Sequence, residues 1–293
     1  RDAPRTNRMP PIIVPPIVLA FAASDPTGGA GIQADLLTLA GLGCHPLSVI
    51  TALTAQDTAG VESIYPIDSD WITDQARMVL EDMPVAAFKI GLLGSVDNIA
   101  AIAAIVSDYP DIPLILDPVL ASGRGDEMAD EEMIEAMIEL LIPQTTVITP
   151  NSQEARRLAA DDNEDDKPAD DTEAPTLHQC AERILAMGCE FVLVTGTHEN
   201  TTQVINTLYG HEGLVRADSW DRLPHTYHGS GCTLASAIAA TLANGLSLPD
   251  AIFQAQEYTW QTLAAGFRPG MGQHLPDRFF WARKVDAPEG EAP

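Results

Sequence analysis

Short apolar runs alternate along the chain with longer segments in which apolar positions recur at the spacing of a helix. The runs are continuous rather than alternating, which is typical of strands that are buried on both faces of a parallel sheet. This alternation predicts an α/β protein, in which helices cover both faces of a mostly parallel central sheet. The expected strands are 17–23, 47–53, 87–90, 113–117, 145–149 and 190–195. The expected helices are 30–42, 70–82, 96–108, 130–141, 151–159 and 176–187.

The pattern changes after residue 200. Segments 201–209 and 213–218 are typical of a hairpin, and two long helices are expected at 231–244 and 249–266. Neither an internal repeat nor a linker divides the chain, so we expect one domain. The expected division is a loose tail at 1–15, a domain at 16–280 with an acidic loop insert at 160–175, and a second tail at 281–293.

The N-terminal region superficially resembles a signal peptide, because three arginines precede an apolar stretch. Pro11, Pro15 and Pro16 interrupt the helix that a signal peptide needs, and the apolar residues lead directly into a glycine-rich turn. We therefore interpret the stretch as the first buried strand. No apolar run approaches the roughly 18 residues of a membrane span. We expect a cytoplasmic protein.

The composition narrows the class of partner. The 293 residues include 42 Asp and Glu but only 16 Lys and Arg, which gives a net charge of −26 and argues against nucleic acid and anionic membranes. Whether this acidity is an ordinary solvated surface or an adaptation to a salty cytoplasm stays open. The scattered cysteines fit a reducing compartment. Lysines occur only at 89, 167 and 284, so a phosphate site must rely on backbone N–H groups, Mg²⁺ or arginine.

The sharpest local motif is H-G-S-G-C-T at residues 228–233, followed by an apolar helix. Small residues at a helix start let several backbone N–H groups converge, and the helix dipole adds positive potential. The motif can form an anion hole for a phosphoryl group, although a plain glycine-rich helix cap is an equally good interpretation. Cys232 stands in the first turn, where we expect that field to lower the pKa of its thiol.

Three other segments place polar residues after predicted strands. S-D-P-T-G-G-A-G-I-Q-A-D at 24–35 has neither the dinucleotide nor the P-loop spacing, but its glycines permit close approach of a ligand. Asp117 ends a buried strand, where it can contact Mg²⁺ or simply cap a loop. Asn151 and Glu154 have the spacing of a capping box, and a role for Glu154 near a metal is the sharper alternative.

Two further residues are unusual for their surroundings. Gln56 follows an apolar strand, where it can be an ordinary loop residue or its amide can pair with the edge of a heterocycle. Lys89 lies inside a short apolar strand, so it must find an anionic or carbonyl partner.

Taken together and in order, six motifs resemble the hydroxymethylpyrimidine/phosphomethylpyrimidine kinases of the ribokinase-like superfamily. After the glycine-rich segment and before H-G-S-G-C-T come V-I-T-A-L-T-A-Q-D-T, K-I-G-L-L-G, L-D-P-V and I-T-P-N-x-x-E-A. The resemblance covers about residues 17–270. It implies a ribokinase-like three-layer αβα sandwich. It also implies ATP-dependent, Mg²⁺-assisted phosphorylation of 4-amino-5-hydroxymethyl-2-methylpyrimidine and then of its monophosphate, a step in thiamine biosynthesis.

The resemblance also implies roles for individual residues. Gln56 hydrogen-bonds the aminopyrimidine, Asp117 and Glu154 help to place Mg²⁺ and ATP, and Cys232 lies beside the accepting hydroxyl. Ala23, Asp35, Leu92 and Val119 line the substrate pocket, while Gly229, Ser230 and Gly231 form the anion hole. Asn151 and Thr195 belong to the ATP side. The expected partners are the pyrimidine and ATP, together with a second copy of the chain in a homodimer.

This chain departs from the family where lysines usually face phosphate. Thr195 stands in place of one lysine, and Gly123 and Arg124 stand near the usual position of another. We hypothesise that Arg124 replaces one of these cations, because a guanidinium binds phosphate in a bidentate manner. A pyridoxal kinase of the same superfamily and a catalytically weak pyrimidine-binding sensor remain alternatives.

Overall fold

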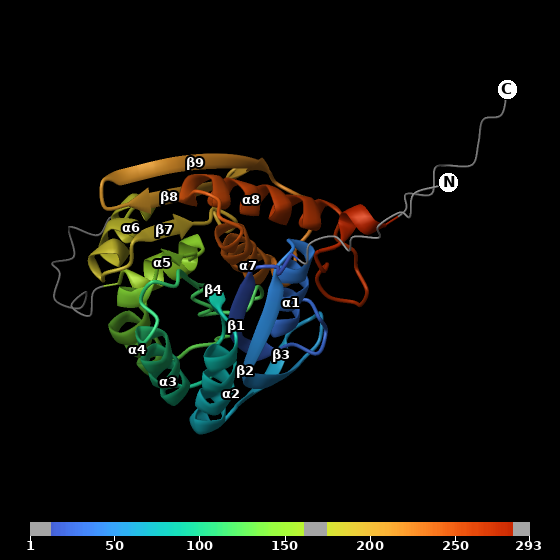
Figure 1. The fold of residues 1–293 in the computed structure, drawn as a ribbon. Helices are drawn as coiled ribbons and strands as arrows, with labels where there is room; N and C mark the ends of the chain where they lie inside the picture. The colour runs from blue at the N-terminus through green and yellow to red at the C-terminus, as the bar shows by residue number, and fades with distance from the viewer. Residues whose placement is uncertain (1–12, 161–174, 284–293) are drawn as a thin grey trace, which may run out of the picture.

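The computed structural model describes residues 13–160 and 175–283 (Figure 1). The acidic insert and both tails expected from the sequence lie almost entirely outside these ranges. In the part that the structure describes, no helix is long and apolar enough to cross a membrane.

The centre of the fold is a nine-stranded sheet in the order β3-β2-β1-β4-β5-β6-β7-β8-β9. The strands β2, β1, β4, β5, β6 and β7 run parallel, whereas β3, β8 and β9 add antiparallel pairs at the two edges. The bounds are β1 Ile17–Ser24, β2 His45–Gln56, β3 Val61–Pro66, β4 Val85–Ile90, β5 Leu114–Leu116, β6 Val147–Ile148, β7 Phe191–Val194, β8 Gln203–Gly210 and β9 Gly213–Asp221.

Helices cover both faces of this sheet (Figure 1). One face carries α2 (Ser69–Asp82), α3 (Val96–Ser107), α4 (Glu131–Ala136), α5 (Ser152–Leu158) and α6 (Leu177–Ala186). The other carries α1 (Gly31–Gly41), α7 (Ser230–Ala243) and α8 (Leu248–Ala264). The layers confirm the three-layer α/β sandwich with a mostly parallel sheet.

The central strand β1 shows why its sequence is apolar throughout. Leu19 and Phe21 pack into the core beneath α2 and α3, whereas Val18 and Ala20 pack into the core beneath α1 and α7. Successive side chains of a strand point to opposite faces, so a strand covered on both sides needs apolar residues at every position.

The structure differs from the sequence prediction in three elements. A 3-10 helix, Phe280–Ala282, extends into the segment predicted as the C-terminal tail. Strand β3 is not predicted, because its side chains are half-buried or exposed and therefore form no apolar run. The predicted helix 130–141 is regular only to Ala136 and continues as a π-helical turn over Met137–Leu141.

The parallel strands all point their carboxyl ends toward one edge of the sheet. Ligands of open α/β sheets bind beyond that edge, which is formed here by the loops that follow β1, β4, β5, β6 and β7.

Candidate active site

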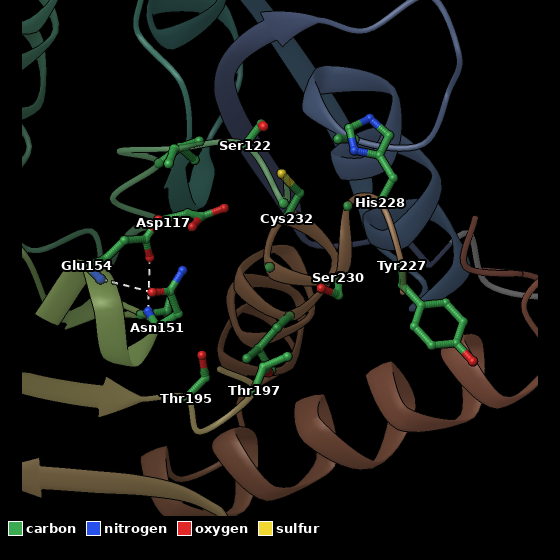
Figure 2. Close-up of a pocket in the computed structure, with 18 of the residues that line it drawn as sticks. Asp117, Ser122, Asn151, Glu154, Thr195, Thr197, Tyr227, His228, Ser230 and Cys232 are labelled. Atoms are coloured by element: carbon green, nitrogen blue, oxygen red, sulfur yellow. Dashed lines mark hydrogen bonds between the residues drawn. The ribbon is translucent and has the colours of Figure 1, made fainter. Parts of the chain in front are cut away.

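A cavity of about 700 Å³ lies at the carboxyl ends of the parallel strands, beside the start of α7 (Figure 2). All but two of the residues that the sequence singled out line it. They are Ala23, Gln56, Leu92, Asp117, Val119, Asn151, Glu154, Thr195, Gly229, Ser230, Gly231 and Cys232. The two others, Asp35 and Arg124, are not among the residues that line this cavity. Segments far apart in the sequence therefore share one cavity.

The start of α7 has the geometry that an anion hole requires. Gly229 precedes the helix with a φ of 84°, in the left-handed region that favours glycine. A Cβ atom at this position would lie 1.8 Å from the carbonyl oxygen of Gly29. The first N–H groups of a helix have no acceptor within the helix. Ser230 and Cys232, which belong to the first turn of α7, line the cavity (Figure 2). Their N–H groups are therefore available to an anion.

The thiol of Cys232 lies between two helix starts and a carboxylate. The backbone N–H of Gly31 at the start of α1 and the carboxylate of Asp117 lie close enough to influence its pKa. Burial raises the pKa of Cys232 to about 12; Asp117 and Asp35 add to the rise, while Lys89 opposes it. The expectation of a lowered pKa is therefore wrong, because desolvation outweighs the field of the helix. The thiol is neutral at neutral pH.

Beneath the cavity lies a buried ion pair. The Lys89 Nζ atom is 2.8 Å from Oδ1 of Asp35, and neither side chain is exposed. Ser236 on α7 donates a hydrogen bond to the same oxygen. The expectation that Asp35 lines the substrate pocket is wrong. Its side chain points from α1 to Ser236 on α7, and Lys89 lines the cavity instead.

This ion pair shapes the charge of the cavity floor. Burial opposes the charge of Lys89, but Asp35, Cys232 and Asp117 together raise its pKa above the usual value. Burial also raises the pKa of Asp117; Lys89 opposes this rise and Asp35 adds to it. Lys89 is thus a permanent cation among acidic groups.

Asn151 and Glu154 form a capping box at the start of α5, as their spacing predicts. The Asn151 side chain accepts hydrogen bonds from the N–H groups of Gln153 and Glu154, and the Glu154 carboxylate accepts one from the N–H of Asn151 (Figure 2). Burial and the nearby Asp117 raise the pKa of Glu154 to about 8.

The carboxylates of Asp117 and Glu154 suit Mg²⁺ whose remaining ligands are phosphate oxygens. Among residues 13–160 and 175–283, no three His, Cys, Asp or Glu side chains gather as a metal site. Mg²⁺ in phosphoryl-transfer sites usually takes only one or two protein carboxylates and completes its shell with phosphate oxygens and water. Asp117 and Glu154 fit that pattern. Because Glu154 already accepts two backbone hydrogen bonds, its contact fits one through water.

One corner of the cavity lining is apolar, and the carboxamide of Gln56 lines the same cavity. Ala23 and Leu92 are buried against each other with Ala52, and Val119 packs on them. Gln56 donates a hydrogen bond of 2.7 Å to the Thr54 hydroxyl, which leaves the carboxamide a carbonyl and a second N–H for a ligand. Such a corner suits a flat, partly polar ring.

A hydrogen bond that the sequence does not predict connects the first glycine-rich turn to the anion hole. Asp25 accepts hydrogen bonds from the N–H groups of Thr27 and Ala30 and lies 2.8 Å from Nε2 of His228. Burial opposes ionisation of Asp25, but these bonds, led by that of His228, outweigh it and lower the pKa of Asp25. The Asp-x-Thr spacing signals the turn, but nothing local signals His228 as its partner.

Arg124 lies in a smaller hollow next to the main cavity. Its side chain is exposed and lies against Gly60. The neighbouring residues Ser122, Gly123 and Gly125 do line the main cavity, so Arg124 belongs to a segment that borders it.

Known proteins resemble this chain over most of its length. The family model described as phosphomethylpyrimidine kinase matches residues 25–277. A hydroxymethylpyrimidine/phosphomethylpyrimidine kinase of Streptomyces coelicolor is 38% identical, covering 89% of this chain and 94% of its own.

Solved structures share the fold of this chain. A phosphomethylpyrimidine kinase of Clostridium difficile is 34% identical with a TM-score of 0.70, and the match covers 85% of this chain and 99% of that one. A pyridoxal kinase of Staphylococcus aureus in complex with ADP is 27% identical with a TM-score of 0.80, and the match covers 92% and 96%.

Proposed function

The chain belongs to the phosphomethylpyrimidine kinase family, and we propose from this premise how its cavity carries out the reaction. The protein is an ATP-dependent kinase of thiamine biosynthesis that acts on 4-amino-5-hydroxymethyl-2-methylpyrimidine and on its monophosphate. In the first step the pyrimidine hydroxyl attacks the γ-phosphorus of ATP, the bond to the β-phosphate oxygen breaks, and ADP leaves. Positioning and charge neutralisation carry most of the catalysis in such reactions.

The apolar corner and Gln56 bind the aminopyrimidine. Ala23, Leu92 and Val119 contact the faces of the ring, while the free carbonyl and N–H of Gln56 pair with the ring edge. This places the hydroxymethyl group toward Cys232 and the start of α7.

The start of α7 binds the migrating phosphoryl group. The N–H groups of Ser230, Gly231 and Cys232 donate to its oxygens, where negative charge concentrates during transfer. Cys232 lies beside the accepting hydroxyl. Because its thiol is neutral in the free protein, it can take the hydroxyl proton only after passing its own to an acceptor, and Asp117 is the nearby carboxylate.

ATP phosphates lie between α7 and the loops after β6 and β7, where Asn151 and Thr195 reach the cavity. Asp117 and Glu154 would hold Mg²⁺ on this side, directly or through water. When bound, Mg²⁺ neutralises phosphate charge and orients the leaving group. Arg124 is our candidate for a further phosphate-binding cation, since its segment borders the cavity.

The observation that carries this assignment is the shared cavity, which joins Gln56, Asp117 and the start of α7. An ADP-release assay coupled to NADH oxidation tests it, with and without the pyrimidine. We expect ADP release that depends on the pyrimidine. Pyrimidine binding without ADP release would instead indicate a sensor, and no response at all would contradict the assignment. Dimer formation stays a prediction from the sequence, which light scattering can test.

A second candidate activity follows from the high TM-score to a pyridoxal kinase. Pyridoxal is also a flat, substituted heterocycle with a hydroxymethyl group. We expect kcat/KM to be higher for the aminopyrimidine than for pyridoxal when both are measured under the same conditions. The reverse order would assign the chain to pyridoxal phosphorylation.

A further inference from the structure

A buried arginine after α8 has a role that neither its sequence context nor the site residues reveal. Arg278 is 3% exposed, although a guanidinium is normally left in water unless it is paired. Within residues 13–160 and 175–283, its hydrogen-bond acceptors are neutral oxygen atoms. Among these residues Arg278 forms no direct ion pair. Asp35 and Asp25 favour its charge from a distance, but the cost of burying the cation outweighs them.

The three acceptors belong to the two glycine-rich segments of the site. One terminal nitrogen of Arg278 donates to the carbonyl of Gly29 at 2.5 Å, and the other donates to that of Gly28 at 3.3 Å. The Nε atom donates to the hydroxyl of Thr233 on α7 at 3.1 Å. The planar guanidinium therefore connects the turn after β1 to the first turn of α7.

Thr233 connects Arg278 to the anion hole through the carbonyl of Gly229. Its hydroxyl donates to the carbonyl oxygen of Gly229 at 2.8 Å, and its N–H donates to the same oxygen at 3.0 Å. The peptide bond between Gly229 and Ser230 is planar and trans, so its N–H points opposite to its C=O. Because Thr233 holds the carbonyl on the helix side, the Ser230 N–H is directed away from the helix, on the side where Ser230 lines the cavity.

The carbonyl of Gly29 is also the atom against which Gly229 packs. A Cβ on Gly229 would lie 1.8 Å from this oxygen, so the two backbones are in close contact. A shift of Gly29 must displace Gly229 or open a gap beside it. Arg278 thus holds both sides of the same contact.

We propose that Arg278 is a positioning residue for phosphoryl transfer, which fixes the Gly28–Gly29 turn against Thr233 and so orients the Ser230 N–H toward the migrating phosphoryl group. This inference rests on the proposed function. Arg278 is buried and is not among the residues that line the cavity, so it contacts neither substrate. Its loss should therefore lower kcat and leave both KM values nearly unchanged.

Four variants test the proposal in the full chain. Arg278→Lys keeps the charge but loses the fork of donors, and Thr233→Val removes only the hydroxyl that relays the constraint. Thr233→Ser restores that hydroxyl. Thr241→Val removes another buried hydroxyl of α7, one that bonds to Ala237 in the same way but is remote from the cavity. It controls for general loss of helix stability.

We expect kcat to fall about 10- to 100-fold in Arg278→Lys and about tenfold in Thr233→Val, since misplacing a group by about 1 Å can cost 10²-fold. The KM values for ATP and the pyrimidine should stay within about threefold. Thr233→Ser and Thr241→Val should keep the kcat of the natural chain. Amide hydrogen exchange at residues 28 and 233, whose N–H groups donate to Asp25 and Gly229, should become faster in the first two variants only.

Folded Arg278→Lys and Thr233→Val proteins with unchanged kcat would overturn the proposal, and so would equal losses in Thr233→Val and Thr241→Val. A loss confined to KM would also contradict it, because that result indicates a binding role. If the natural chain transfers no phosphate, the proposed function fails instead. The exchange experiment then still decides the positioning role, because unchanged exchange in folded Arg278→Lys would refute it.

Discussion

Replacing Lys89 by methionine should destabilise the protein severely, because it leaves the carboxylate of Asp35 buried without its cation. Methionine has a similar length and shape, so the change removes charge with little loss of packing. Both partners have no exposed side-chain surface, and water cannot take the place of the ammonium group. Breaking one side of a buried ion pair typically costs about 3–5 kcal/mol.

The geometry supports a value in this range. At 2.8 Å between Nζ and Oδ1, two unit charges attract by about 6 kcal/mol at an effective dielectric constant of about 20. Part of this attraction offsets the cost of burying both charges. For a domain of this size, each kcal/mol corresponds to roughly 2–4 °C, so the melting temperature should fall on the order of 10 °C.

Urea unfolding followed by circular dichroism measures the loss directly. Asp35→Asn keeps an acceptor for Ser236 but removes the charge, and the double variant removes both charges together. We expect the double variant to be more stable than the sum of the two single losses predicts. Arg77→Met is the matched control, since the Arg77–Asp108 pair is partly exposed and should contribute less than about 1 kcal/mol. A Lys89→Met protein as stable as this control, or strictly additive losses, would refute the reasoning.

Four further predictions concern the site. Cys232→Ser should keep the fold and pyrimidine binding but lose at least about tenfold in kcat; unchanged kcat would rule out a role of the thiol in proton transfer. Gln56→Ala should raise KM for the pyrimidine about tenfold and leave KM for ATP unchanged, whereas a shift in both would contradict its assignment. Arg124→Ala should raise KM for ATP or for the phosphorylated pyrimidine, and an unaltered KM for both would dismiss it as a phosphate ligand. Asp25→Asn should cost about 1–3 kcal/mol at pH 6 by weakening the bonds to His228 and the turn. Because the pKa of Asp25 is lowered from 3.8, this difference in unfolding free energy should vanish as the pH falls below 3.8 through the lowered value; a difference that persists at lower pH would contradict a stabilising role of the ionised carboxylate.

The sequence predicts the fold well where burial dictates it. The β1 run is apolar at every position because both faces are covered, and this pattern alone indicates a parallel sheet. It fails for β3, which lies at an edge of the sheet with half-buried and exposed side chains. The positions of the carboxyl-end loops follow from the topology, so most site residues that end or follow strands were found.

Residues whose role depends on distant partners were not predicted correctly. Asp35 belongs to a recognisable motif, but only the packing of α1 on α7 shows that it faces Ser236 and Lys89. The raised pKa of Cys232 arises from burial, which the helix start alone does not reveal. Arg278 contacts residues almost the whole chain away, and no local pattern marks such a contact.

The central claim is that one cavity places a pyrimidine hydroxyl in line with the γ-phosphate of ATP at the start of α7. Phosphorus NMR of the products formed from 4-amino-5-hydroxymethyl-2-methylpyrimidine and ATP tests it most directly. We predict a phosphomonoester signal first and then the paired doublets of a pyrimidine diphosphate. A spectrum that contains only ATP, ADP and inorganic phosphate would contradict the claim.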